Sequence, residues 1–123
     1  MKLHLSQPAG KNAITGYGED YVLVNRERHD KTVVVLPDRL VTDWTATSFE
    51  ALTADQLSEL LPLAPEILLL GTGATLRFPR IEILAPLIRA KLAYEVMDTQ
   101  AACRTYNILM SEERKVAAAL LLG

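Results

Sequence analysis

Cysteine and histidine are scarce in this sequence, which contains one cysteine, Cys103, and two histidines, His4 and His29. A single cysteine cannot form a disulfide within the chain, and this usage is typical of proteins from a reducing compartment. One cysteine and two histidines with no ligand spacing around them are too few for a tetrahedral zinc site. We therefore expect a cytoplasmic protein that holds no metal ion.

Aromatic residues and excess basic charge are also lacking, since aromatics make up 6% of the residues and the net charge is −2. This balance leaves no electrostatic footprint for a nucleic acid or an anionic membrane surface. No apolar run approaches the ~20 residues of a membrane span, and positions 1–14 have no apolar core of signal-peptide length. We expect no nucleic-acid partner and no membrane insertion.

What the chain does contain is typical of a globular protein, because half of its 123 residues are hydrophobic. With so few aromatics, the core has to be built from leucine, valine, isoleucine and alanine. The length suits one domain over residues 1–123.

The first half of the chain predicts short strands. The β-branched runs at 21–24 and 32–36 flank the polar stretch 25–31, a pattern that predicts an antiparallel hairpin with a long loop. Further short strands are predicted at 12–17 and 41–44. Thr53 and Gln56 have capping-box spacing and predict a helix over 54–61.

The second half alternates strands with helices, a pattern that predicts right-handed crossovers and a parallel segment. Because 67–70 is apolar throughout, we expect it and 94–97 to lie side by side and parallel in the middle of a covered sheet. Pro86 lies inside the helix predicted at about 80–92, so we expect that helix to start late or to kink at Pro86. The chain is therefore an α/β protein with a central mixed sheet and an N-terminal antiparallel hairpin. The predicted elements are a strand at 67–70, a helix at about 80–92, a strand at 94–97, a helix at about 99–110 and a strand at 116–122.

Gly71, Thr72 and Gly73 follow a buried strand, where glycines allow positive φ and close approach of a ligand or another chain. Asp98 and Thr99 follow the next strand, and ligands of open α/β sheets sit beyond such strand ends. One interpretation is a crevice for an anionic ligand or a partner, with Arg77 as counter-charge. The other is a structural turn, with Asp98 as a helix cap.

No complete catalytic motif accompanies this loop. A dinucleotide fingerprint needs a third glycine where Leu76 stands, and no Gly-Lys-Ser/Thr is present for a phosphate-binding loop. Cys103 has no histidine motif near it and is predicted to be a small core residue rather than a nucleophile. No pair of carboxylates is marked for acid–base work, so we name no catalytic residue.

Three segments in order carry a family resemblance: Pro65 to Gly73, Tyr94 to Thr99 and Ala102 to Leu109. With Ile14 to Tyr17 and Trp44, they resemble the domain-of-unknown-function family that includes mitochondrial NADH dehydrogenase (complex I) assembly factor three.

This resemblance implies a three-layer α/β fold of the Mth938-like type, no established enzymatic activity and no cofactor. It also implies an accessory protein that binds a protein partner, such as a respiratory-complex subunit. The alternative from the residues is a small-ligand binder or enzyme at the crevice. The chain departs from the family at Lys91 and Glu113, where members often carry glycine, and we expect local remodelling of those turns.

Overall fold

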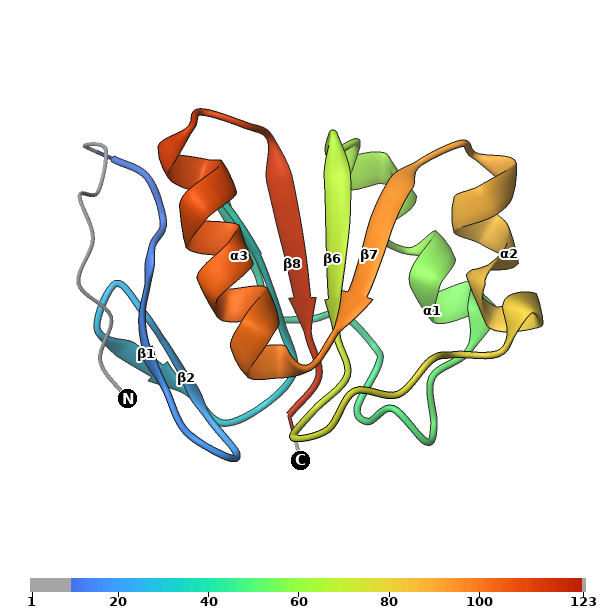
Figure 1. Cartoon of the computed structure of the whole chain (residues 1–123), viewed down its shortest axis with the longest axis horizontal. Helices are drawn as coiled ribbons and strands as arrows, with labels where there is room; N and C mark the ends of the chain where they lie inside the picture. Colours follow the sequence, from blue (N-terminus) through green and yellow to red (C-terminus); the bar gives the residue numbers. More distant parts are fainter. Residues whose placement is uncertain (1–9, 123) are drawn as a thin grey trace.

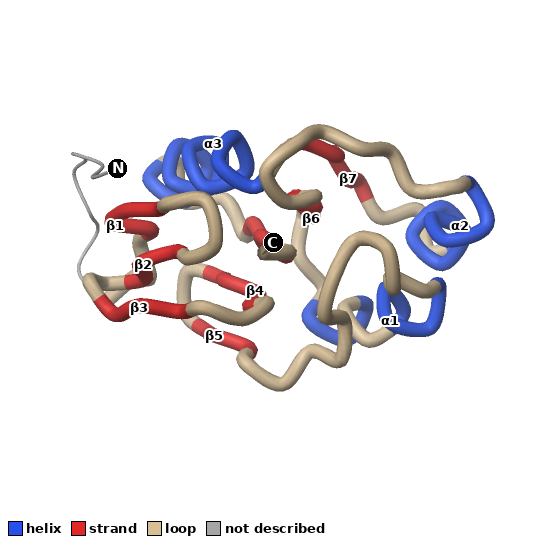
Figure 2. Tube along the Cα trace, turned by 90° about the horizontal axis from the view of Figure 1, so that it is seen from below, coloured by secondary structure: helices blue, strands red, loops and turns tan. Residues whose placement is uncertain are grey.

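A five-stranded sheet with helices on both faces forms the centre of the computed structural model, which describes residues 10–122 (Figure 1). A second, three-stranded sheet lies beside it near the start of the described chain (Figure 2). The elements in chain order are β1 (Ile14–Tyr17), β2 (Val22–Val24), β3 (Glu27–His29), β4 (Val33–Leu36), β5 (Arg39–Val41), α1 (Ala54–Ser58), the 3-10 helix η1 (Leu61–Leu63), β6 (Ile67–Gly71), α2 (Ile81–Arg89), β7 (Ala93–Met97), α3 (Thr99–Ser111) and β8 (Val116–Leu120).

The larger sheet is mixed, as predicted, with the strand order β5-β4-β8-β6-β7. β6 pairs in parallel with both β7 and β8, whereas β4 pairs antiparallel with β5 and β8. The last strand of the chain thus lies between β4 and β6. Every residue of β4 and β8 is buried, and only Ile67 of β6 is partly exposed. These runs are apolar throughout because both of their faces are covered.

The fold has three layers, because the two faces of the large sheet are covered by different elements. On β4, Val33 and Val35 pack with α3 and the small sheet, while Val34 and Leu36 pack with the side that carries α1 and α2. Alternation along a strand sends successive side chains into these two separate cores. Figure 2 shows α3 on one side of the sheet and α1 and α2 on the other.

The predicted antiparallel hairpin exists, but its partner strand was wrong. Residues 22–24 pair with β3 and not with 33–36, which belong to the other sheet. The turn is only Asn25 and Arg26, which have φ values of 51° and 70°. A two-residue turn with positive φ at both positions joins antiparallel strands tightly. The polar composition of β3 and a turn without glycine hid this strand in the sequence.

The position predicted for β7 was partly wrong. β6 and β7 do lie side by side and parallel, with Leu70 opposite Val96. β7 is nevertheless an edge strand, and its Ala93 and Glu95 are exposed. The middle of the sheet is taken by β8, which the chain order alone did not indicate.

The predicted helix starts are confirmed by their hydrogen bonds. The Thr53 hydroxyl accepts from the Gln56 N–H, and the Gln56 side chain accepts from the Thr53 N–H, which completes the capping box. Asp98 Oδ1 accepts from the Ala101 N–H at 2.9 Å and so caps α3. α1 ends at Ser58, earlier than predicted, and Pro86 lies inside α2 rather than at its start.

Lys91 and Glu113 follow the ends of α2 and α3 with φ values of 55° and 63°. In each turn two amides bond back into the helix, Leu92 N–H to Leu87 O and Arg114 N–H to Leu109 O among them. This is the Schellman arrangement that glycine favours. The expected remodelling is therefore absent at these two turns, which keep the glycine-type conformation with non-glycine residues.

Candidate functional site

The predicted crevice lies at the carboxyl ends of β6 and β7, which are next to each other. Gly71 is opposite Met97 in the parallel register, so the two loops that follow meet directly. The Gly73 N–H donates to Thr99 Oγ1 at 2.8 Å, and the Thr99 N–H donates to Gly73 O at 2.9 Å. The structure thus brings Gly71, Gly73 and Thr99 together as the strand order required.

Thr99 also forms a hydrogen bond to the residue that follows β8. Its hydroxyl donates to Leu121 O at 2.6 Å, and the Leu121 N–H donates to Gly71 O at 3.0 Å. The Thr99 residue is 6% exposed. One hydroxyl therefore joins the ends of β6 and β8 to the start of α3, in a position shielded from water.

Both glycines are required by the local geometry, for different reasons. A Cβ on Gly71 would lie 2.9 Å from Thr99 Oγ1 and 3.0 Å from Thr99 Cα. Gly73 has a φ of 100°, a conformation that residues with a Cβ rarely adopt. The close approach of α3 to the end of β6 thus explains Gly71, and the backbone conformation explains Gly73.

Thr72 and Arg77 brace the loop that leads to α2. Thr72 is fully buried, its N–H donates to Met97 O at 2.9 Å, and its hydroxyl donates to Thr75 O at 2.7 Å. Arg77 Nη2 donates to Thr72 O at 3.0 Å. The Arg77 guanidinium lies 4.4 Å from the centre of the Phe49 ring and forms an ion pair with Glu50.

Arg77 therefore already has an anionic neighbour. Hydrogen bonding from its guanidinium lowers the pKa of the Glu50 carboxyl. The amides of Thr72 and Gly73, which a bound anion would need, donate within the chain. This geometry favours the structural interpretation of Gly71, Thr72, Gly73, Arg77, Asp98 and Thr99. Ligand binding at this crevice stays a prediction.

Cys103 lies in the core between α3 and the sheet and is fully buried. Burial raises the pKa of the thiol from its ordinary value of 9.0 to about 12. A nucleophilic cysteine requires the opposite shift. Within residues 10–122 no three side chains of metal-ligand type lie together, and His4 is outside this range.

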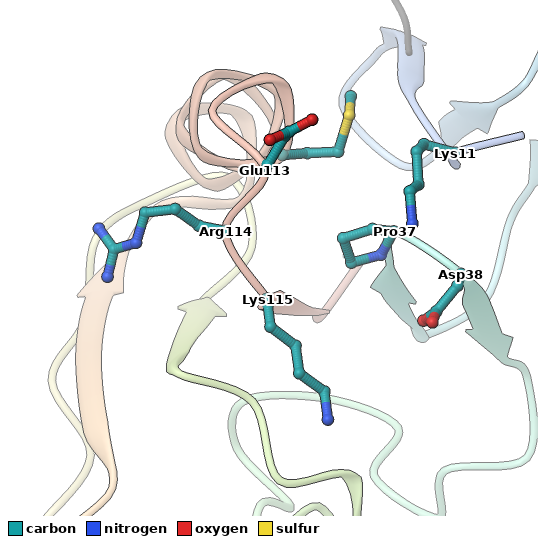
Figure 3. A pocket seen from close by; sticks show the side chains of 7 residues that line it. Lys11, Pro37, Asp38, Glu113, Arg114 and Lys115 are labelled. Carbon is teal, nitrogen blue, oxygen red and sulfur yellow. The ribbon is translucent and has the colours of Figure 1, made fainter. Parts of the chain in front are cut away.

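A pocket of about 330 Å³ opens at the other end of the strands from the crevice, between the end of α3 and the turn from β4 to β5 (Figure 3). Arg114 bonds to Glu66, whose pKa is lowered by the Lys115 N–H and the Arg114 side chain. The sequence analysis did not identify this pocket, because it combines scattered charges of both signs. Its lining includes Lys11, Pro37, Asp38, Met110, Glu113 and Lys115.

Asn107 is a structural residue whose role the sequence analysis did not assign. Its Oδ1 accepts from the Ile14 N–H at 2.9 Å, and its Nδ2 donates to Ile14 O at 2.7 Å. The neighbouring Tyr106 hydroxyl donates to Asn12 O at 2.8 Å. α3 therefore holds β1 through side chains that bond to the backbone as a neighbouring strand would.

Exposed apolar side chains are concentrated in one segment of the chain. Among the described residues, five large apolar side chains are exposed, and four of them lie between positions 76 and 88. We call Leu76, Phe78, Ile81 and Ile88 the apolar segment residues; they are 50%, 70%, 61% and 45% exposed. The fifth is Ile108 on α3. This segment is the clearest candidate for contact with another molecule.

The comparisons with known proteins decide the family. A family model described as a protein of unknown function (DUF498/DUF598) matches residues 14–121. The chain belongs to this family. The resemblance proposed from the sequence motifs is therefore confirmed.

A Danio rerio relative named NADH dehydrogenase (ubiquinone) 1 alpha subcomplex assembly factor 3 is 40% identical to the DUF498 chain over 89 residues. The matched region covers 71% of this chain and 51% of the relative. The chain thus spans about half the length of that protein.

Two solved structures are similar to this chain in both sequence and fold. A Bordetella parapertussis crystal structure is 41% identical with a TM-score of 0.85, and the match covers 94% of this chain and 100% of that one. A Bordetella pertussis protein described as an Mth938-like domain is 34% identical with a TM-score of 0.78, covering 98% and 92% of the two chains. The fold is therefore Mth938-like, as expected.

Proposed function

We propose that this chain is a non-catalytic accessory protein that binds a protein partner during the assembly of a respiratory complex, with complex I as its target. The observation that carries the proposal is membership of the DUF498 family together with relatives named as complex I assembly factors. We also propose a cytoplasmic location, with which its free cysteine is in keeping.

The features of the described residues support a binding role rather than catalysis. The thiol is buried and protonated, and the polar groups of the Gly-Thr-Gly loop bond within the chain. The apolar segment residues instead offer surface that another protein could cover. None of the helices within residues 10–122 has the length and apolar character of a membrane span.

Affinity purification of the tagged chain from native membranes in mild detergent tests this proposal. We expect complex I subunits to be enriched over a tagged control protein, and deletion of the gene to lower the amount of assembled complex I. Absence of these subunits together with an unchanged complex I content would refute the assembly role.

The alternative function, a binder of a small anionic ligand at the crevice, is not favoured by the comparisons or by the bonded loop amides. A thermal-shift screen with nucleotides, phosphates and small carboxylates distinguishes it. A ligand at 100 times its dissociation constant would add about 2.7 kcal/mol of stability. A reproducible shift that Arg77→Ala abolishes would revive the alternative.

A further inference from the structure

The outer side of β7 is an open strand edge within the described structure. β7 ends the sheet order, and its one strand partner among residues 10–122 is β6. Met97 O accepts from the Thr72 N–H, so the backbone groups of Met97 point toward the β6 side. Backbone groups alternate in direction along a strand. The N–H and C=O groups of Tyr94 and Val96 therefore point outward, where an added strand would bind.

The helix next to this edge, α2, carries exposed apolar side chains. Ile81 and Ile88 are seven residues apart on α2, so they share one stripe of the helix, and both are exposed. Figures 1 and 2 both place α2 next to β7 at the same end of the molecule. Tyr94 and Val96 pack in the same core as Leu84 and Leu87 of α2, so one face of the β7 edge is the face that α2 covers. An open strand edge next to a helix with exposed apolar side chains suits an extended segment, whose backbone pairs with the strand while alternate side chains make apolar contacts.

Charge decides which kind of segment fits. Glu95 is exposed and has no ion-pair partner among the described residues. A lysine or arginine beside it on an added strand forms a favourable pair, whereas a like charge is unfavourable. A second copy of β7, paired antiparallel with Tyr94 opposite Val96, would place Glu95 against Glu95. Glu95 thus disfavours self-pairing in this register and favours a basic partner segment.

We propose that β7 binds an extended segment of a partner protein as an added strand, with apolar side chains toward α2 and a basic residue beside Glu95. This inference rests on the proposed function, because it describes how the assembly partner is held. Successive side chains of a strand point to opposite faces. The segment therefore alternates apolar residues, which face α2, with basic residues, which face Glu95.

Synthetic peptides test the site without knowledge of the natural partner. The probe is a seven-residue peptide that alternates valine with lysine, and its counterpart alternates valine with glutamate. Titration followed by backbone amide NMR should shift the Tyr94 and Val96 signals with the lysine peptide. The glutamate peptide should bind about threefold or more weakly. Glu95→Lys should reverse this preference. Unchanged β7 signals at millimolar lysine peptide, or the same preference in Glu95→Lys, would overturn the proposal.

Variants of this chain test whether the native partner binds at the same edge. Val96→Pro removes an outward-facing N–H, and proline is tolerated on edge strands at such positions, so the fold should persist. Ile81→Asp changes the apolar stripe, and Ile108→Asp is its matched control on α3, since the two isoleucines are 61% and 58% exposed. We expect Val96→Pro and Ile81→Asp each to lower partner capture about tenfold, and Ile108→Asp to leave it unchanged.

The two proposals fail in different ways. If the wild-type chain captures complex I subunits and Ile81→Asp captures them equally, the β7 site is refuted while the assembly role stands. If no complex I subunit is captured but the lysine peptide binds at β7, the assembly role is refuted while the strand-binding edge stands. A concentration-dependent dimer that Val96→Pro abolishes would show that the edge pairs with itself and would also overturn the proposal.

Discussion

Gly71 is the residue on which the contact between β6 and α3 depends. A Cβ at this position would lie 3.0 Å from Thr99 Cα, a backbone atom that cannot move without shifting the start of α3. We expect Gly71→Ala to lower the free energy of unfolding by about 1–3 kcal/mol, the usual cost of overpacking. Urea denaturation measures the change. A variant as stable as the wild type would show that the loop and α3 separate easily.

Lys91 and Glu113 are residues that the chain keeps in a conformation suited to glycine. Their positive φ costs free energy in the folded state, while glycine loses more entropy on folding, so the net gain from substitution is modest. We expect Lys91→Gly and Glu113→Gly each to raise the free energy of unfolding by about 0.5–1 kcal/mol. Lys91→Ala is the control, because alanine keeps the strain and should give no such gain. Thermal unfolding compares the three variants.

At the scale of elements, α3 attaches the small sheet through Asn107. Both backbone groups of Ile14 bond to this one buried amide. We expect Asn107→Ala to lower the free energy of unfolding by about 2–4 kcal/mol, since it leaves a buried donor and acceptor unpaired. Arg104→Ala is the control, because Arg104 also bonds the small sheet, through the Tyr17 hydroxyl, but is exposed.

Hydrogen exchange separates local from global effects in this comparison. The Ile14 amide should lose protection in Asn107→Ala more than amides of β6 and β8 do, because the lost bonds hold β1. Equal loss of protection throughout the molecule, or an equal effect of Arg104→Ala, would contradict the specific role of Asn107.

Local signals in the sequence predicted most elements correctly, but they did not predict strand partners. The capping box at Thr53 and Gln56 and the Asp98 cap depend on spacing alone, so they could be identified without the structure. Pairing of β2 with β3 depends on a turn formed by Asn25 and Arg26, and neither residue marks such a turn as strongly as glycine. A β-branched composition indicates that a strand exists, not which strand lies next to it.

The candidate site shows the same division. That Gly71 and Thr99 would meet followed from the order of β6, β7 and α3, because parallel strands end at one edge. That the loop amides bond to Thr99 Oγ1 and Met97 O could not be derived, since it depends on how closely α3 approaches. The open edge at β7 was likewise hidden, because the insertion of β8 into the sheet is a non-local pairing.

For the whole molecule, the buried thiol of Cys103 links stability to alkaline pH. The folded chain keeps the thiol protonated to a pKa of about 12, whereas the unfolded chain releases the proton near 9.0. Because the folded pKa is raised, the stability contribution is fully present below the unfolded value and is lost as pH rises toward the folded value. Burial raises the pKa of Tyr106 in the same direction. Stability should therefore fall as the solution becomes alkaline.

Comparison with Cys103→Ala isolates the part of this loss that belongs to the thiol. From about pH 9 to 11, the free energy of unfolding of the wild type should fall by about 2 kcal/mol more than that of the variant. Urea denaturation with reductant measures both curves. The cavity in Cys103→Ala lowers its stability by a similar amount at every pH, and Tyr106 acts in both proteins, so only the difference in slope reports the thiol. Parallel curves would mean that Cys103 reaches water in the folded state, and the core between α3 and the sheet would then be less closed than its burial indicates.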